Sequence, residues 1–203
     1  MAYWFLALII GYFLGSFPTG YVVGRAKGVD VRRFGSGATG GTNVLRTLGA
    51  GPAILTGVTD LAKGMLGAYI GYKLAGDVGY ALGGFGAVVG HSYPVWLKFK
   101  GGKSVATGAG ALVIFHPLAF LVGLVAGLGS LMPTRYVSLG SLVGALAFGG
   151  TIWLSNAPAA HKLLAFGIVL VVYVRHWSNM KRLATGTENK FGQKAKPRTE
   201  GTV

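Results

Sequence analysis

The chain has no cysteine, which excludes disulfides, cysteine-ligated zinc, iron–sulfur clusters and a covalent thioester on the protein. Charged residues are also scarce: they make up 12% of the 203 residues, where a soluble domain carries about 25%. The mean hydropathy is +0.55. A chain this apolar is typical of an integral membrane protein.

Acidic residues are few as well, with five Asp and Glu against 19 Lys and Arg and a net charge of +14. Such a charge can indicate nucleic-acid binding, but here the basic residues lie in short clusters between apolar runs and not on one soluble surface. We therefore expect no nucleic-acid partner and a lipid bilayer instead.

The apolar runs define candidate membrane helices, taking about 20 residues per span. The sequence predicts helices over 2–23, 52–74, 79–97, 105–116, 118–132, 136–154 and 160–176. Two of them, 105–116 and 118–132, are short, and His116-Pro117 between them is either a tight turn or a kink in one broken helix. We expect an all-α polytopic integral membrane protein with about seven transmembrane helices, or five as the alternative. The first run is not preceded by Lys or Arg, so we expect it to stay as a helix and not to be a secretory signal.

Lys and Arg residues are distributed unequally between the predicted connections. Nearly all fall on one side, namely Arg25, Lys27, Arg32, Arg33, Arg46, Lys98, Lys100, Lys103, Arg135, Arg175, Lys181, Arg182, Lys190, Lys194, Lys196 and Arg198. Only Lys73 and Lys162 fall on the other side. The positive-inside rule then places the N-terminus outside, the C-terminus in the cytoplasm and every basic loop on the cytoplasmic face.

We expect residues 1–182 to form a single transmembrane domain. Residues 183–203 are predicted to be a polar basic tail along anionic headgroups, with its last residues disordered. Lys63 lies within a predicted helix with Asp60 three residues earlier, where the two can pair as a structural anchor or take part in chemistry.

Many of the 36 glycines recur four residues apart, a spacing that lets transmembrane helices approach closely. The pairs are Gly11/Gly15, Gly67/Gly71, Gly86/Gly90, Gly123/Gly127 and Gly140/Gly144. We interpret these as packing residues.

The stretch RRFGSGATGGTNVLRTLG, from Arg32 to Gly49, is different because it is polar and cationic. GSGATG matches the dinucleotide pattern G-x-G-x-x-G, but no hydrophobic strand precedes it. GGKS at Gly101–Ser104 resembles the end of a P-loop, but Leu97 stands where its first glycine is required. What remains is the physics of anion binding: glycines expose backbone N–H groups, and a short helix from Thr42 or Asn43 adds its positive dipole end.

Two further segments on the same predicted face carry similar residues. GHSYPVWLKFKGGKSVAT (90–107) contains His91, two glycines and Lys103, and VRHWSNMKRLATGTENK (174–190) contains His176 and Asn179. Three such segments on one membrane face predict one shared phosphate site; the alternative is three solvated loops that only satisfy charge topology.

These motifs, together with GSFPTGY (15–21), GSGATGGTNVLR (35–46) and RHWSNMKRL with GTENK, resemble in content and order those of the bacterial acyl-phosphate:glycerol-3-phosphate acyltransferase family. The resemblance covers about nine-tenths of the chain. Ala38 stands where the family commonly has Asn, Gly41 where it has Ala, and Ser104 where it has Gly. The resemblance implies a polytopic membrane enzyme that moves a fatty acyl group from acyl phosphate to the sn-1 hydroxyl of glycerol 3-phosphate, giving lysophosphatidic acid and phosphate, the first acylation of phospholipid synthesis.

The resemblance also implies roles for individual residues. The expected catalytic residues are Ser36, Arg46, His91, Lys103, His176 and Asn179, and the expected phosphate-binding residues are Gly35, Gly37, Gly40, Gly41, Thr42, Asn43, Gly101, Gly102, Ser104, Ser138 and Ser141. Ser36, Arg46 and Lys103 would hold glycerol phosphate. Gly40 to Asn43, with Asn179, would hold acyl phosphate.

Some roles stay open from the sequence. Each histidine can polarise a phosphate, orient a neighbour or act as base, and Ser138 and Ser141 either reach the site or pack helices. No carboxylate is expected to be available as general base, since Asp60 would pair with Lys63 and Glu188 falls in the tail, so we expect a substrate phosphate oxygen to take the hydroxyl proton.

Rival functions make different demands on the sequence. An acyl-CoA enzyme of the H-x-x-x-x-D type would need an Asp five residues after a histidine, and none of the four histidines has one. We therefore expect no CoA. A transporter of an organic phosphate would also use cationic loops, but no inverted repeat is visible, and a scaffold would not need three phosphate-like loops. No cofactor is expected, and the four histidines lack the spacing of metal ligands.

Overall fold

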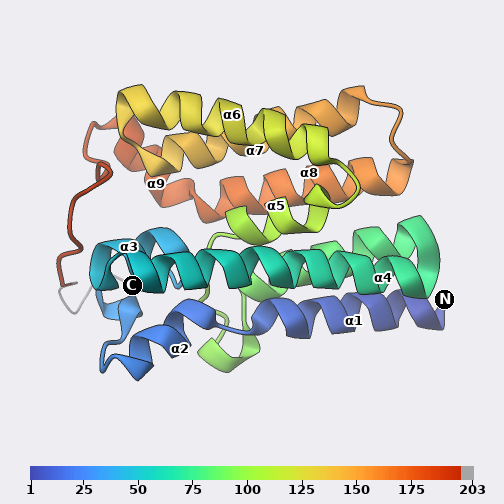
Figure 1. The fold of residues 1–203 in the computed structure, drawn as a ribbon, viewed down its shortest axis with the longest axis horizontal. Coiled ribbons are helices and arrows are strands. Elements are labelled where there is room, and N and C mark those ends of the chain that lie inside the picture. Colours follow the sequence, from blue (N-terminus) through green and yellow to red (C-terminus); the bar gives the residue numbers. More distant parts are fainter. Residues whose placement is uncertain (198–203) are drawn as a thin grey trace.

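The structure is a computed structural model that describes residues 1–197, and within that range it is built from helices with no β-strand. In chain order the helices are α1 (Ala2–Ser16), α2 (Thr19–Ala26), η1 (Val31–Arg33), α3 (Gly41–Leu48), α4 (Ala50–Ser92), η2 (Val95–Leu97), α5 (Val105–Val113), α6 (Pro117–Thr134), α7 (Val137–Leu154), α8 (Ala159–Arg175) and α9 (Trp177–Ala184). Figure 1 shows α1 and α4 on one side of a bundle and α6, α7 and α8 on the other, with α5 between them. The all-helical fold class is confirmed.

The long helix α4 is really a hairpin of two helices. Ala75 and Gly76 have non-helical backbone angles, with φ of −151° and 59°, and the chain turns back there. The two arms correspond to the predicted helices 52–74 and 79–97. The second arm ends at Ser92, earlier than predicted, because Pro94 disfavours helical geometry in the residue before it.

The predicted helix 2–23 is interrupted. Pro18 cannot continue the hydrogen-bond ladder of α1, so α1 ends at Ser16 and α2 starts at Thr19. At the break, the Phe17 carbonyl oxygen accepts a hydrogen bond from Lys63 of α4 at 3.0 Å.

Close helix packing confirms the interpretation of the paired glycines. A Cβ built on Gly15 would lie 2.0 Å from the Ala87 carbonyl oxygen, so α1 and α4 touch backbone to backbone. Gly127 and Gly140 face each other in the same way between α6 and α7. Side chains larger than glycine would push these helices apart.

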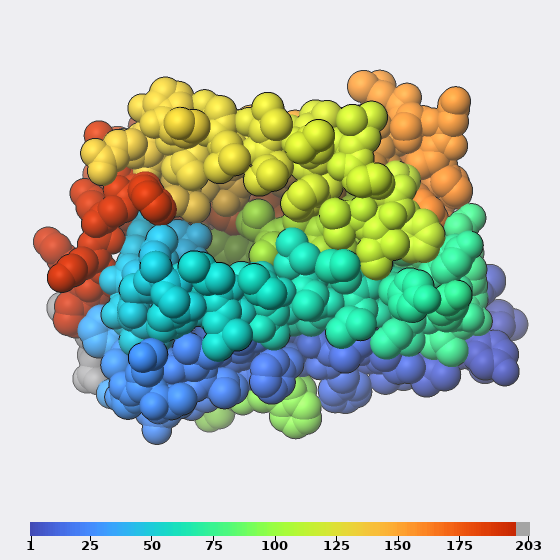
Figure 2. Space-filling view, in the orientation of Figure 1, coloured from blue at the N-terminus to red at the C-terminus, as the bar shows by residue number. Residues whose placement is uncertain are grey.

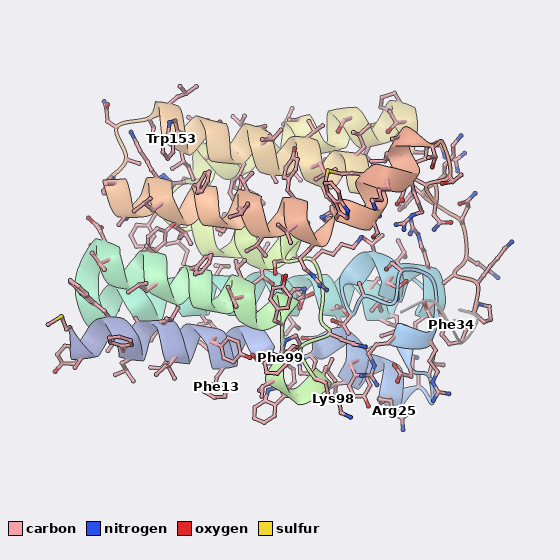
Figure 3. All side chains as sticks on the ribbon, turned by 180° about the vertical axis from the view of Figure 1, so that it is seen from behind. Phe13, Arg25, Phe34, Lys98, Phe99 and Trp153 are labelled. Atoms are coloured by element: carbon pink, nitrogen blue, oxygen red, sulfur yellow. The ribbon has the colours of Figure 1, made fainter. Side chains whose placement is uncertain are left out.

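By length and hydropathy, three helical stretches of the described chain can cross a membrane: Ala2–Ala26, Pro117–Thr134 and Val137–Leu154. A fourth is α8 with α9, if this pair, bent by 58°, is counted as one broken span. The helices α2, α3 and α9 gather at one end of the bundle, opposite the N-terminus (Figure 1). In Figure 3, Arg25 and Phe34 lie at this end and Trp153 at the other.

Candidate active site

A cavity of about 390 Å³ lies where α3, the first arm of α4, α5, α7 and the corner between α8 and α9 meet. Most of the residues predicted for the site line it: Ser36, Gly40, Gly41, Thr42, Asn43, Arg46, His91, Lys103, Ser104, Ser138, Ser141, His176 and Asn179. Three segments far apart in the sequence therefore meet at one place.

The other predicted residues, Gly35, Gly37, Gly101 and Gly102, support the cavity from behind and do not line it. Gly35 and Gly37 have φ of 53° and 72° and shape the loop before α3. Gly101 and Gly102 lie against His91, where a Cβ on Gly102 would fall 1.9 Å from the His91 Nε2 atom. These four glycines position backbone, and none of their atoms forms the cavity wall.

Asn43 fixes the loop in front of α3. Its Nδ2 atom donates to the carbonyl oxygens of Val31, Phe34 and Ala38, and its Oδ1 atom accepts from the Ser36 backbone N–H. The side chain is therefore fully engaged with the loop. This geometry favours a positioning role for the Asn43 side chain over direct contact with a phosphate.

The start of α3 points its first residues at the cavity. The helix begins at Gly41, with Gly40 extended before it, and the first N–H groups of a helix have no partner inside the helix. Arg46 lies one turn further on, lines the same cavity and donates to the Asn189 carbonyl oxygen at 3.1 Å. Backbone donors and a guanidinium on one wall are the groups that anion-binding sites in proteins use.

Glu188 is a site residue that sequence reasoning missed. Its side chain is 2% exposed, lines the cavity and accepts hydrogen bonds from Ser138 (3.1 Å), Asn179 (2.7 Å) and Arg182 (2.7 Å). Lys103 donates in turn to the Asn179 Oδ1 atom. A carboxylate thus joins α7 and α9 and orients the amide that meets Lys103.

Asp60 is a second carboxylate in the wall of the cavity. It pairs with Lys63 at 2.8 Å as predicted, and lies 3.3 Å from the His91 Nδ1 atom. The sequence signal for Glu188 was its place in GTENK, one of the motifs that carry the family resemblance. The sequence places Glu188 in the tail because no local pattern shows that the chain folds back after α9.

His176 is held in one orientation. Its Nδ1 atom lies 2.8 Å from the Val172 carbonyl oxygen, which can only accept, so Nδ1 carries the proton and Nε2 keeps its lone pair. The residue is 3% exposed and lines the cavity. His176 can therefore accept a hydrogen bond from a bound hydroxyl.

Burial lowers the pKa of the Lys103 amine to about 8; Glu188 raises it, and the neighbouring cations Arg182, Arg46 and Arg175 lower it further. Since lysine is charged below its pKa, Lys103 loses its charge as the pH rises through about 8. We predict that kcat/KM for a phosphorylated substrate falls roughly tenfold per pH unit above that point. The measurement is a pH profile of kcat/KM on purified protein.

The matched control for this profile is Lys103→Arg, because a guanidinium stays charged throughout. In that variant the alkaline fall should disappear, whatever the variant's absolute rate. A wild-type profile that stays flat for two units above the predicted pKa would contradict the assignment of Lys103 as the titrating cation.

An apolar groove of about 210 Å³ continues from the cavity between α5, α6, α7 and α8. The two share Val105, Ala109, Val137 and Ser141 as lining residues. Figure 2 shows the surface hollowed between α6 and the first arm of α4. A cavity lined by Arg46 and Lys103 and joined to an apolar groove, in a bundle of membrane-type helices, has the shape that suits a ligand with an anionic head and an apolar chain.

Comparison with known proteins identifies the class of protein. The model of the family described as glycerol-3-phosphate acyltransferase matches residues 5–186. A glycerol-3-phosphate acyltransferase of Symbiobacterium thermophilum is 56% identical over 190 residues, covering 94% of this chain and 96% of the relative. One of Synechococcus elongatus is 43% identical over 196 residues, covering 92% and 93%. The chain belongs to the glycerol-3-phosphate acyltransferase family.

Solved structures agree with this assignment. The glycerol 3-phosphate form of PlsY, an integral membrane glycerol 3-phosphate acyltransferase, superposes with a TM-score of 0.89 at 36% identity, covering 93% of this chain and 96% of that one. Its lysophosphatidic acid form gives a TM-score of 0.86 at 35% identity, covering 93% and 95%. The membrane-protein class and the family resemblance found in the sequence are confirmed.

Proposed function

We propose that this protein transfers a fatty acyl group from acyl phosphate to the sn-1 hydroxyl of glycerol 3-phosphate, releasing phosphate and lysophosphatidic acid. The observation that carries the proposal is the cationic cavity that opens into an apolar groove. Acyl phosphate needs both surfaces, one for its phosphate and one for its chain. The glycerol 3-phosphate and lysophosphatidic acid forms of PlsY support the acceptor and the product for a related enzyme.

The walls of the cavity suggest how two phosphates are placed. Ser36, Arg46 and Lys103 would hold glycerol 3-phosphate, and the N–H groups from Gly40 into the start of α3 would hold acyl phosphate, whose chain extends along the groove. Acyl phosphate is a mixed anhydride with a good leaving group, so the protein mainly binds charge and orients one hydroxyl.

No covalent nucleophile is needed, and three of the four serines that line the cavity donate their hydroxyl to another group. The Oγ atom of Ser104 donates to the Val88 carbonyl oxygen, that of Ser138 to Glu188, and that of Ser141 to the Val137 carbonyl oxygen. None of these hydroxyls is paired with a histidine base, as an activated nucleophile requires. Direct transfer between the two substrates is therefore favoured.

In that transfer the sn-1 oxygen forms a bond to the acyl carbonyl carbon, and the bond from that carbon to the phosphate oxygen breaks. The departing phosphate takes the electron pair, and a phosphate oxygen accepts the hydroxyl proton. The Glu188 carboxylate accepts three hydrogen bonds, and this arrangement fits a structural role better than the role of a general base. If His176→Ala bound both substrates and did not turn over, the lone pair on Nε2 would be the preferred base.

We also propose the finer topology: seven crossings, with the N-terminus outside and the C-terminus and the site on the cytoplasmic side of a bacterial inner membrane. Lys73 and Lys162 lie in the helix ends remote from the cavity, and the excess of Lys and Arg at the cavity end supports that orientation by the positive-inside rule. Residues 1–182 would form the transmembrane catalytic domain. The tail from 183 would still contribute Glu188 to the site.

The donor is tested with purified protein in detergent. Given acyl phosphate and labelled glycerol 3-phosphate without CoA, it should form a lipid-extractable product and one phosphate per product. The same protein with acyl-CoA as donor should form none. Uptake of an organic phosphate into proteoliposomes with no acyl product would instead show a transporter.

A further inference from the structure

The segment that carries Lys103 has little internal means of keeping its shape. Gly101 and Gly102 precede the lysine, and glycine loses more conformational freedom on ordering than any other residue. Yet both are buried, and a Cβ on Gly101 would fall 2.2 Å from the His91 carbonyl oxygen. The path of this segment must therefore be fixed by contacts from outside it.

One set of contacts comes from the end of α4. The Gly101 N–H donates to the Ser92 carbonyl oxygen at 3.2 Å, and the Gly102 N–H donates to the His91 carbonyl oxygen at 3.0 Å. These bonds use the two N–H groups of the glycine pair. The two carbonyl oxygens of the glycine pair are not used by these bonds, and they point to the opposite side of the segment.

Arg175, the last residue of α8, occupies that other side. Its Nε atom donates to the Gly102 carbonyl oxygen at 3.0 Å, and its Nη2 atom donates to the Gly101 carbonyl oxygen at 3.2 Å. The guanidinium also lies 5.1 Å from the centre of the Tyr93 ring. A planar fork with two donors on adjacent carbonyls fixes direction as well as distance.

Arg175 is not itself a wall of the cavity, but its neighbours in sequence are. His176 follows it, and Asn179, whose Oδ1 atom accepts from Lys103, lies four residues on. The corner between α8 and α9 thus holds Lys103 twice, once by its backbone through Arg175 and once by its amine through Asn179.

We infer that Arg175 is a positioning residue for the transfer: its fork on the Gly101 and Gly102 carbonyls sets where the Lys103 ammonium meets a substrate phosphate. The inference rests on the proposed function for its kinetic consequence. In the sequence Arg175 is one of the cations on the basic side and the first residue of the motif RHWSNMKRL, and neither feature predicts a fixed partner for it.

The variant Arg175→Met keeps the apolar stem and removes both donors. We expect kcat/KM to fall by about 100-fold, as when a catalytic group moves by about 1 Å. In Arg175→Lys the amine can reach one carbonyl only, so the kcat/KM of this variant should lie between those of Arg175→Met and wild type. Lys100→Met is the matched control, because it removes an exposed cation next to the same segment, and it should stay within about threefold of wild type.

A double-mutant cycle separates positioning from general damage. In a Lys103→Gln background, Arg175→Met should lower kcat/KM further by less than about threefold, since the amine that Arg175 positions is already gone. An undiminished loss in that background would overturn the inference, and so would Arg175→Met with wild-type kcat/KM.

Amide hydrogen exchange of the peptide 93–104 tests the contact between Arg175 and the glycine pair without an activity measurement. Exchange at Gly101 to Lys103 should speed up in Arg175→Met and stay unchanged in Lys100→Met. Unchanged exchange in Arg175→Met would overturn the inference even if activity fell. If wild-type protein transferred no acyl group, the proposed function would fail, while the exchange result would still decide whether Arg175 holds this segment.

Discussion

Gly40→Val should abolish acyl transfer and leave the protein folded. A Cβ at Gly40 would meet no atom within 4 Å, and its φ of −79° suits any residue, so valine fits the protein without strain. Because Gly40 lines the cavity, the added methyl groups would occupy the space in front of the α3 N–H groups. Losing such a charge-binding surface should reduce kcat/KM by about 100- to 1,000-fold.

The control for Gly40→Val is Gly51→Val in the first turn of α4. A Cβ at Gly51 also meets nothing within 4 Å, and this residue is exposed and outside the cavity. Since valine is a somewhat better helix former than glycine, Gly51→Val should leave stability unchanged or raise it by about 0.5 kcal/mol, with no change in activity. If Gly40→Val turned over normally with an unchanged melting temperature, the loop before α3 would be only a connection.

Glu188→Gln should have the largest effect on stability. The substituted amide cannot accept from Ser138, Asn179 and Arg182 as a carboxylate does, and its own NH2 group would face other donors. Breaking a buried charged network costs about 3 kcal/mol. Thermal unfolding in detergent should show a clearly lower midpoint, with activity reduced because Asn179 is no longer oriented.

Asp77→Asn makes the same chemical change far from the site. Asp77 pairs with His161 at 3.1 Å, but its side chain is 50% exposed, so the loss should be below about 1 kcal/mol. If the two variants lost equal stability, the hydrogen-bond network of Glu188 would contribute no more to stability than an exposed pair does.

Local chemistry predicted much of this structure. Apolar runs gave the order of the helices, glycines four residues apart gave the contacts of α1 with α4 and of α6 with α7, and the spacing of Asp60 and Lys63 gave their ion pair. Glycines, hydroxyls and cations in three segments gave most of the cavity lining. Each of these features depends on neighbours in sequence or on one simple rule of packing.

The features that the sequence did not predict depend on where the chain goes after a helix ends. Glu188 reaches the cavity because the residues after α9 turn back across the bundle, where the Ala195 N–H donates to the Arg46 carbonyl oxygen at 3.0 Å. The fork of Arg175 depends on the corner between α8 and α9 meeting the loop before α5. No periodicity and no short motif in the sequence predicts such long-range contacts.

The central claim is that one cavity holds two phosphates on different walls, glycerol 3-phosphate on Lys103 and acyl phosphate on the loop at Gly40. The most direct test is the KM of each substrate in two variants, Lys103→Gln and Gly40→Ala, the milder change that leaves measurable turnover. Lys103→Gln should raise the KM for glycerol 3-phosphate at least tenfold more than the KM for acyl phosphate. Gly40→Ala should raise the KM for acyl phosphate at least tenfold more than the KM for glycerol 3-phosphate. A tenfold difference corresponds to roughly the strength of one charge-assisted hydrogen bond. Both variants raising the KM of the same substrate would contradict the account.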